Sequence, residues 1–218
     1  MSLNRTAAST RSALGDLPRN VWVTTITSFL TDVSSEMVLN LVPLFLANVL
    51  GVRTGVVGLI EGLAEMTASL LKVFSGWLSD RLGQRKRLAV AGYGLSTLSK
   101  PFLYLASSWG WVLAVRFADR VGKGIRTAPR DALIADSITE RNRGLAFGLH
   151  RAGDTAGAMV GLLIALGIVW AAQGRALSLG RPAFQTVVLV SIIPAALAVL
   201  VLAWGARDVP APTDRPST

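Results

Sequence analysis

The sequence predicts an all-α membrane protein with six transmembrane helices. Three observations lead to this fold class: long apolar stretches recur along the chain, short charged or turn-like connections separate them, and basic residues gather in the connections on one side. Of the 218 residues, 51% are hydrophobic, and the mean hydropathy of +0.50 exceeds that of an ordinary soluble domain. Each apolar stretch is long enough to cross a hydrocarbon core of about 30 Å.

The six predicted helical segments cover residues 21–49, 54–79, 87–107, 109–136, 144–171 and 183–204. Together they form one bundle over residues 21–204, between a polar tail at 1–20 and a second tail at 205–218. The first tail lacks the apolar core of a signal peptide. Pro101, directly after Lys100, is expected to kink the third segment.

The distribution of basic residues predicts the orientation of the bundle. The connections on one side of the bundle hold only three basic residues, Arg53, Arg175 and Arg181, and eight more basic residues lie inside the spans. The other eleven lie in the two tails and in the connections on the same side as the tails. Both termini are therefore expected in the cytoplasm, with the chain in a bacterial-type inner (plasma) membrane. This topology accounts for the net charge of +9 without nucleic acid as a partner, although a basic tail that binds anionic lipid stays an alternative. Eleven basic residues lie on the predicted cytoplasmic side: Arg5, Arg11, Arg19, Arg81, Arg85, Lys86, Arg87, Arg141, Arg143, Arg207 and Arg215.

The composition excludes several kinds of site. The chain has no cysteine and one histidine, His150, so disulfides, zinc–thiolate sites and multi-histidine metal sites within one chain are excluded. No P-loop pattern is present, which argues against ATP-driven pumping by this chain. No nucleophile–base pair stands out either, so an intramembrane enzyme is the weakest interpretation. We expect no catalytic residue, no cofactor and no bound metal.

Almost all of the charged residues inside the spans lie in four of the six, the first, second, fourth and fifth. A charge at the centre of a bilayer costs at least about 2.5–3.5 kcal/mol, so the first, second, fourth and fifth spans must face protein or water. The third span carries only Lys100 and the sixth carries none, so both can face lipid. The candidate residues of a substrate or proton pathway are Asp32, Glu36, Glu61, Glu65, Arg116, Asp119, Arg120, Arg151 and Asp154.

Two interpretations of these charges stay open. Seven acidic and eight basic residues nearly balance within the spans, so they can be structural ion pairs between helices. Alternatively, some of them line a water-filled path and change protonation during transport. Asp32 and Glu36 have no cation on their own helix, which makes them the best candidates for proton carriers.

Two motifs resemble those of the major facilitator superfamily. Residues 76–87 read GWLSDRLGQRKR, similar to that family's Gly-x-x-x-Asp-Arg-x-Gly-Arg-Arg/Lys loop, with Gln84 where an Arg is usual. Residues 116–124 read RFADRVGKG, similar to its Arg-x-x-Gln-Gly-x-Gly helix, with Asp119 and Arg120 in place of Gln and Gly. The resemblance extends over residues 20–208 and includes the glycines Gly153, Gly157 and Gly161. It implies a conformational-switch loop built by Gly76, Asp80, Arg81, Gly83 and Arg85.

The resemblance implies one half of this family's fold: a six-helix bundle made of a 3+3 inverted repeat. In that arrangement the first and fourth helices line a cavity, the second and fifth flank it, and the third and sixth lie outside. In the switch loop, Asp80 is expected to accept hydrogen bonds from an arginine or a helix N-terminus, so that it stabilises one of two bundle arrangements. The alternative for Asp80 is a helix cap combined with membrane anchoring.

The expected function is secondary active transport by alternating access. A natural half-size chain would pair with a second copy as a parallel two-fold homodimer in the lipid bilayer, because the polar faces need a partner. Protons are the expected coupling ion, and the basic fourth span points to a small anionic or zwitterionic solute. Two alternatives remain: a truncated N-terminal half of a longer chain, and a non-transporting scaffold or regulatory half that needs a different partner half.

Overall fold

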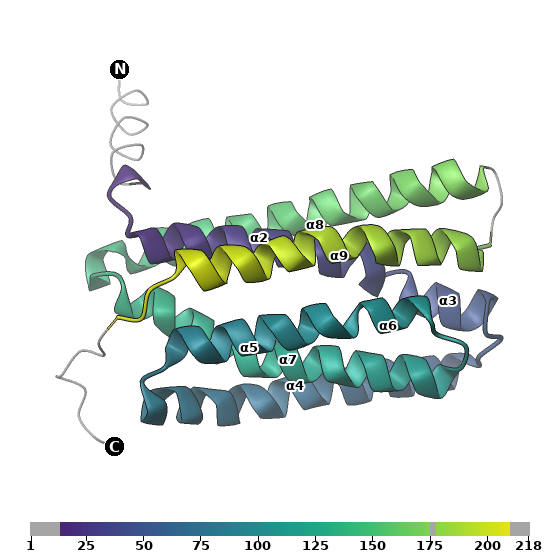
Figure 1. Cartoon of the computed structure of the whole chain (residues 1–218), viewed down its shortest axis with the longest axis horizontal. Helices are drawn as coiled ribbons and strands as arrows, with labels where there is room; N and C mark the ends of the chain where they lie inside the picture. Colours follow the sequence, from purple (N-terminus) through teal and green to yellow (C-terminus); the bar gives the residue numbers. More distant parts are fainter. Residues whose placement is uncertain (1–13, 175–177, 210–218) are drawn as a thin grey trace.

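The computed structural model describes residues 14–174 and 178–209, and its regular elements in these ranges are helices. Figure 1 labels them from α2 onward. Their bounds are α2 Arg19–Leu39, α3 Val42–Asn48, α4 Thr54–Leu82, α5 Arg85–Ser99, α6 Pro101–Tyr104, α7 Trp109–Asp136, the short 3-10 helix η1 Glu140–Asn142, α8 Arg143–Gln173 and α9 Arg181–Gly205.

Three stretches within the described ranges are long and apolar enough to cross a membrane. They are Arg19–Asn48, Glu140–Gln173 and Arg181–Gly205. These stretches contain the predicted first, fifth and sixth spans. The second, third and fourth predicted spans correspond to α4, to α5 with α6, and to α7. Because α4 and α7 carry so much charge, these spans stay predictions.

The helix ends follow the predicted segments closely, with two interruptions. Helix α7 has the predicted bounds 109–136, whereas α2 begins at Arg19, two residues before the predicted first segment. The first segment is interrupted at Asn40 and Leu41, and α3 then restarts with Pro43 in its first turn. The third segment breaks at Lys100, directly before Pro101, in agreement with the expected kink.

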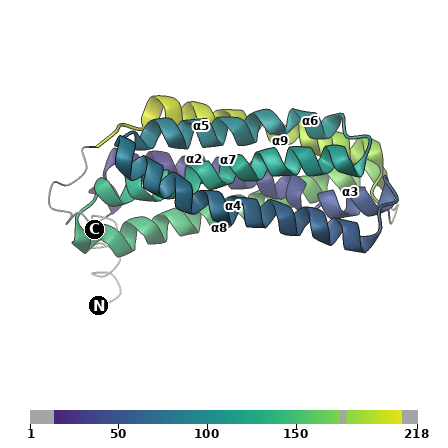
Figure 2. The same ribbon diagram turned by 90° about the horizontal axis from the view of Figure 1, so that it is seen from below.

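The long helices form two layers (Figure 1). Helix α2 packs against α8 and α9 in one layer, and α7 packs against α4 and α5 in the other. Figure 2 shows α5 and α9, which contact each other, along one side of the bundle and α4 and α8 along the opposite side. Helices α2 and α7 therefore occupy the middle of the bundle, between the side formed by α5 and α9 and the side formed by α4 and α8.

Glycines allow the helices within each layer to approach closely. A Cβ atom added at Gly153 of α8 would lie 2.7 Å from Thr25 of α2, and at Gly157 and Gly161 it would meet backbone atoms of Phe29 and Val33. The glycine row of the fifth predicted span therefore allows close packing of α8 against α2. In the other layer, a Cβ at Gly92 of α5 would lie 2.6 Å from the carbonyl oxygen of Gly122 on α7.

The two ends of the bundle are held differently. At the end with α3 and α6, an apolar core includes Phe45 and Phe184, whose stacked rings have centroids 4.1 Å apart. At the opposite end, the Nδ2 atom of Asn20 donates to Ser137 Oγ (2.8 Å) and to the Arg207 carbonyl oxygen (2.9 Å). The start of α2, the end of α7 and the chain after α9 therefore meet at one end of the bundle (Figure 1).

Candidate functional site

Helix α7 carries a row of five basic side chains along one face. They recur at three- and four-residue steps, which place them on one side of a helix. Because the helix runs through the middle of the bundle, three of these charged side chains are buried: Arg116, Arg120 and Arg126. Buried charge of this density needs partners from neighbouring helices. The α7 basic row consists of Arg116, Arg120, Lys123, Arg126 and Arg130.

Helix α4 supplies the carboxylates for the first part of this row. Arg116 is 2% exposed and forms an ion pair with Glu61, while its Nη1 atom lies 4.0 Å from Asp119 Oδ2. One turn further along, Glu65 lies 3.6 Å from both Arg120 Nε and Lys123 Nζ. The structure therefore brings together five predicted pathway residues, which come from α4 and α7.

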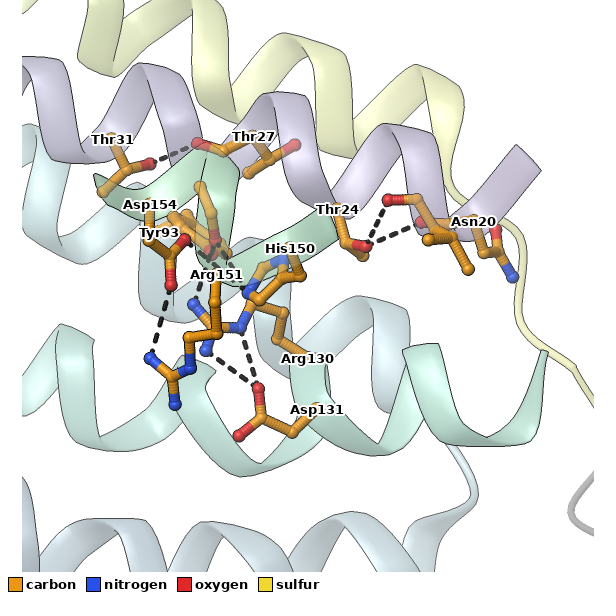
Figure 3. Close-up of polar contacts among 12 residues, drawn as sticks. Asn20, Thr24, Thr27, Thr31, Tyr93, Arg130, Asp131, His150, Arg151 and Asp154 are labelled. Atoms are coloured by element: carbon orange, nitrogen blue, oxygen red, sulfur yellow. Dashed lines mark hydrogen bonds and ion pairs between the residues drawn. The ribbon is translucent and has the colours of Figure 1, made fainter. Parts of the chain in front are cut away.

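The last part of the row meets α2, α5 and α8 in a second cluster (Figure 3). Arg130 Nη1 donates to Ser28 Oγ at 2.9 Å, and Arg130 Nη2 lies 2.8 Å from Asp131 Oδ1. Ser28 Oγ also lies 3.2 Å from Tyr93 Oη and 3.5 Å from His150 Nε2. We call Ser28, Tyr93, Arg130, Asp131 and His150 the Ser28 cluster, in which one hydroxyl joins four helices.

The predicted residues of α8 border the Ser28 cluster. Asp154 Oδ1 lies 3.7 Å from His150 Nε2, and Asp154 Oδ2 lies 3.4 Å from Arg151 Nη1. The Arg151 side chain is 73% exposed, whereas Asp154 is 16% exposed. Asp154 thus connects a buried histidine to a cation on the surface of the bundle.

Arg126 is buried without a carboxylate partner among the described residues. Its Nη1 atom donates to Ser96 Oγ at 2.8 Å, and its guanidinium lies 4.5 Å from the centroid of the Tyr93 ring. A cation over an aromatic face gains electrostatic stabilisation from the ring. Arg126 therefore leaves positive potential available to neighbouring carboxylates.

The two predicted proton carriers have different surroundings. Asp32 of α2 is half-buried, and no residue of the described chain forms a hydrogen bond or ion pair with its carboxylate. The charges that act on it include Asp154, Arg126 and Arg130. Glu36 accepts a hydrogen bond of 2.9 Å from Asn40 Nδ2 on its own helix. Asp32 thus lies within electrostatic reach of Arg126 and Arg130 on α7, although no cation lies near it on its own helix.

Lys100 is a buried cation that was not among the predicted pathway residues. Its Nζ atom donates to Ser34 Oγ at 2.6 Å and to Ser35 Oγ at 3.3 Å, and the residue is 5% exposed. Its span can still face lipid, because Leu98 and Phe102 are exposed. The only sequence signal for an inward position was the charge itself in an otherwise apolar span.

The predicted switch loop lies at the end of the bundle where α4 meets α5 and α7. Arg85 Nη2 lies 3.3 Å from Asp80 Oδ1, and Arg85 Nε lies 2.6 Å from Asp136 Oδ2. Gly83 has a φ of +63°, which a glycine adopts without strain and which ends α4. Asp80 therefore forms an ion pair with an arginine of the loop itself.

The other two loop residues contact their neighbours more loosely. Arg81 lies over the Trp77 ring, with its guanidinium carbon 5.4 Å from the ring centroid. A Cβ atom added at Gly76 would lie 3.4 Å from the Cβ of Ala128 on α7. Gly76 thus lies at the crossing of α4 and α7, whereas Arg81 is on the surface.

Comparisons with known proteins place these features in a family context. Residues 24–218 match the sequence profile of the Major Facilitator Superfamily. An uncharacterised MFS-type transporter of Methanocaldococcus jannaschii is 41% identical over 151 residues, which cover 69% of this chain and 37% of that protein. An uncharacterised protein of Mycobacterium tuberculosis is 32% identical over 212 residues, which cover 97% of this chain and 49% of that protein. The chain thus spans half or less of the length of these relatives.

A solved structure matches the fold of the bundle. It is a bacterial homolog of the human lysosomal transporter Spinster in an inward-facing and occupied conformation, with a TM-score of 0.69. The sequence identity is 18%, and the match covers 88% of this chain and 44% of that one. At this identity, the likeness concerns the fold.

Proposed function

The chain belongs to the major facilitator superfamily and is an integral membrane protein with that family's all-helical fold, and on this premise we propose that it forms one half of a secondary active transporter. The half consists of six spans: α2 with α3, α4, α5 with α6, α7, α8 and α9. In the proposed orientation, the end with Arg19, Arg85 and Gly205 faces the cytoplasm of a plasma membrane.

The packing of the helices supports a 3+3 inverted repeat. If the first three spans correspond to the last three, α2 corresponds to α7, α4 to α8 and α5 to α9. Helix α2 packs against α8 and α9, and α7 packs against α4 and α5. The first helix of each repeat thus packs against the second and third helices of the other repeat, which places α2 and α7 at the centre.

The observation that carries the proposal is the relation of Asp32 to the α7 basic row. Asp32 lies near the middle of the stretch formed by α2 and α3, it has no ion-pair partner among the described residues, and Arg126 and Arg130 act on it from across the bundle. A carboxylate of this kind can gain and lose a proton when a moving bundle changes its exposure to water. Asp32 is the proposed coupling residue, and Glu36 the proposed second site on the same helix.

The second half of the transport pathway is supplied by another bundle. Glu65, Ser69 and Lys72 are exposed on α4 in a helix of membrane length, and exposed charge of this kind is improbable against acyl chains. A second copy in parallel orientation would cover this surface and complete a cavity between α2 and α7 of the two copies. The proposed solute is a small anion or zwitterion, because the α7 basic row borders that cavity.

The test is proton movement in proteoliposomes. The purified chain is reconstituted with a pH dye inside the vesicles, and a panel of small organic anions and zwitterions is added outside at an imposed pH gradient. We expect at least one solute to cause a change in internal pH with the native chain. Asp32→Asn is expected to abolish this change, whereas Glu140→Gln, which alters an exposed carboxylate outside the long helices, is expected to leave it intact. An unchanged response in Asp32→Asn would remove Asp32 from coupling.

A further inference from the structure

Lys100 and Arg116 line one small cavity between α2, α5, α6 and α7. Its other polar lining residues are Ser35, Ser99 and Asp119. The centre of a water-sized sphere can move within about 20 Å³ of this cavity, which is enough for one small group but for no complete organic solute. Of the three charged residues that line the cavity, Lys100 and Arg116 are cations and Asp119 is a carboxylate.

Lys100 is held rigidly beside the cavity. Ser34, which accepts the 2.6 Å hydrogen bond from Lys100 Nζ, itself donates to the Ser191 carbonyl oxygen at 2.6 Å. An ammonium group has three N–H donors, and hydroxyl groups take two of them here. Lys100 forms no ion pair with any residue that the structure describes, although a buried cation is strongly stabilised by a counter-ion.

Arg116, which also lines the cavity, has N–H groups without a hydrogen-bond acceptor in the described chain. One Nη2 hydrogen is directed at Glu61, but neither Nε nor Nη1 donates a hydrogen bond within the described chain, and both atoms are buried. The nearest carboxylate oxygen to Nη1 is Asp119 Oδ2, at the long distance of 4.0 Å. A buried guanidinium with unused N–H groups is a strong site for an oxyanion or halide.

We propose that Lys100 and Arg116 together bind one small anionic group in this cavity. The group is a halide ion or one oxygen of a carboxylate, because the cavity accepts nothing larger. It would receive the third Lys100 N–H and the unused N–H groups of Arg116. The cavity thus selects solutes with a slender, singly charged carboxylate end, or binds free halide; the assignment to the solute rests on the proposed transport function, whereas the binding itself does not.

The test measures anion binding without transport. The full chain in detergent is titrated with sodium chloride or sodium acetate against a bulky sulfonate salt at constant ionic strength. Thermal unfolding is followed by the fluorescence of its six tryptophans. We expect a saturable rise of the unfolding midpoint, because a ligand that binds only the folded state stabilises it. The rise should be absent in Lys100→Met and present in Lys72→Met, which removes an exposed cation away from the cavity.

A second variant keeps both cations and narrows the cavity. Val115 lines the cavity, and Val115→Ile adds one methyl group to its wall. This change is expected to raise the half-saturating anion concentration by about tenfold, because the added carbon occupies the space of the ligand. It remains informative if Lys100→Met does not fold.

The outcomes separate the two sources of the anion. Saturation by chloride alone assigns the cavity to free halide, and saturation by acetate assigns it to the carboxylate end of a solute. The proposal is overturned if neither salt gives a saturable rise, or if Lys100→Met and Val115→Ile respond like the native chain. Either of those results leaves proton coupling through Asp32 untouched, since that is measured separately.

Discussion

The Nε atom of Arg85 lies 2.6 Å from Oδ2 of Asp136, and both side chains are almost completely buried at the end of the bundle. Arg85 begins α5 and Asp136 ends α7. A 3.3 Å contact also links Arg85 to Asp80, which lies near the end of α4. One guanidinium thus joins three helices of the same layer. Asp80 itself is 64% exposed, so the buried half of this arrangement is the Arg85–Asp136 pair.

Loss of Arg85 is expected to destabilise the fold. Arg85→Met removes one partner of a buried ion pair, which typically costs about 3–5 kcal/mol. The measurement is the free energy of unfolding in detergent, followed by tryptophan fluorescence. Arg87→Met is the control, because Arg87 is exposed and contacts only the Gln84 side chain. Equal stability of the two variants would contradict the structural role of Arg85.

The crossing of α8 over α2 makes a prediction for one glycine. Gly157→Ala places a methyl group against the Phe29 backbone, which must move, and is expected to cost about 1–3 kcal/mol. Gly167→Ala on the same helix meets open space and is expected to stabilise α8 by up to about 1 kcal/mol. Thermal unfolding of both variants is the measurement. A neutral Gly157→Ala would mean that the two helices are further apart than described.

The carboxylates of α4 are expected to differ in importance for stability. Glu61→Gln leaves Arg116, which is 2% exposed, with only the long 4.0 Å ion pair to Asp119 and is expected to cost about 3 kcal/mol. Glu65 is 58% exposed, and its two ion pairs are long, so Glu65→Gln is expected to cost about 1 kcal/mol or less. Comparing unfolding midpoints tests this order. If Glu65→Gln were the more destabilising variant, Glu61 would be more exposed to water than its burial indicates.

The hydroxyl of Ser28 is expected to hold the Ser28 cluster together. Ser28→Ala removes the acceptor of the 2.9 Å hydrogen bond from Arg130 and the partner of Tyr93, at a cost of about 1–3 kcal/mol. Thr155→Ala is a suitable control, because Thr155 is exposed on α8. If Ser28→Ala unfolds at the same temperature as the control, the cluster contributes little to stability.

The sequence predicted the helices because their signals are local. Charged and turn residues delimit each span, and the predicted bounds 109–136 agree with α7. The break between α2 and α3 was missed, although Pro43 was a signal for it, since the residue before a proline disfavours helix. Pro101 gave the corresponding break in the third span.

The site was only partly predictable, since its partners come from different helices. The α4 carboxylates and the first residues of the α7 basic row were among the predicted pathway residues, because charge inside a membrane span is itself a signal, but their pairing was not predicted. Ser28 and Tyr93 are ordinary residues in the sequence, and only the crossing of α2 and α5 with α7 brings them to Arg130. Lys100 was assigned to a lipid-facing span because the preference of a whole helix does not show where one side chain points.

In the proposed transporter, the charged faces of α2, α4, α7 and α8 meet a second bundle across water. The chain has no cysteine, so single cysteines can be placed in an unaltered background. We compare Ser69→Cys on the polar stripe of α4 with Ile193→Cys, an exposed apolar position on α9, in native membranes. A charged, membrane-impermeant thiol reagent and a short bifunctional cross-linker are applied to both. We expect rapid labelling and cross-linked dimers for Ser69→Cys alone. If Ser69→Cys is not labelled, or if both positions are labelled equally, these faces do not meet a second bundle across water.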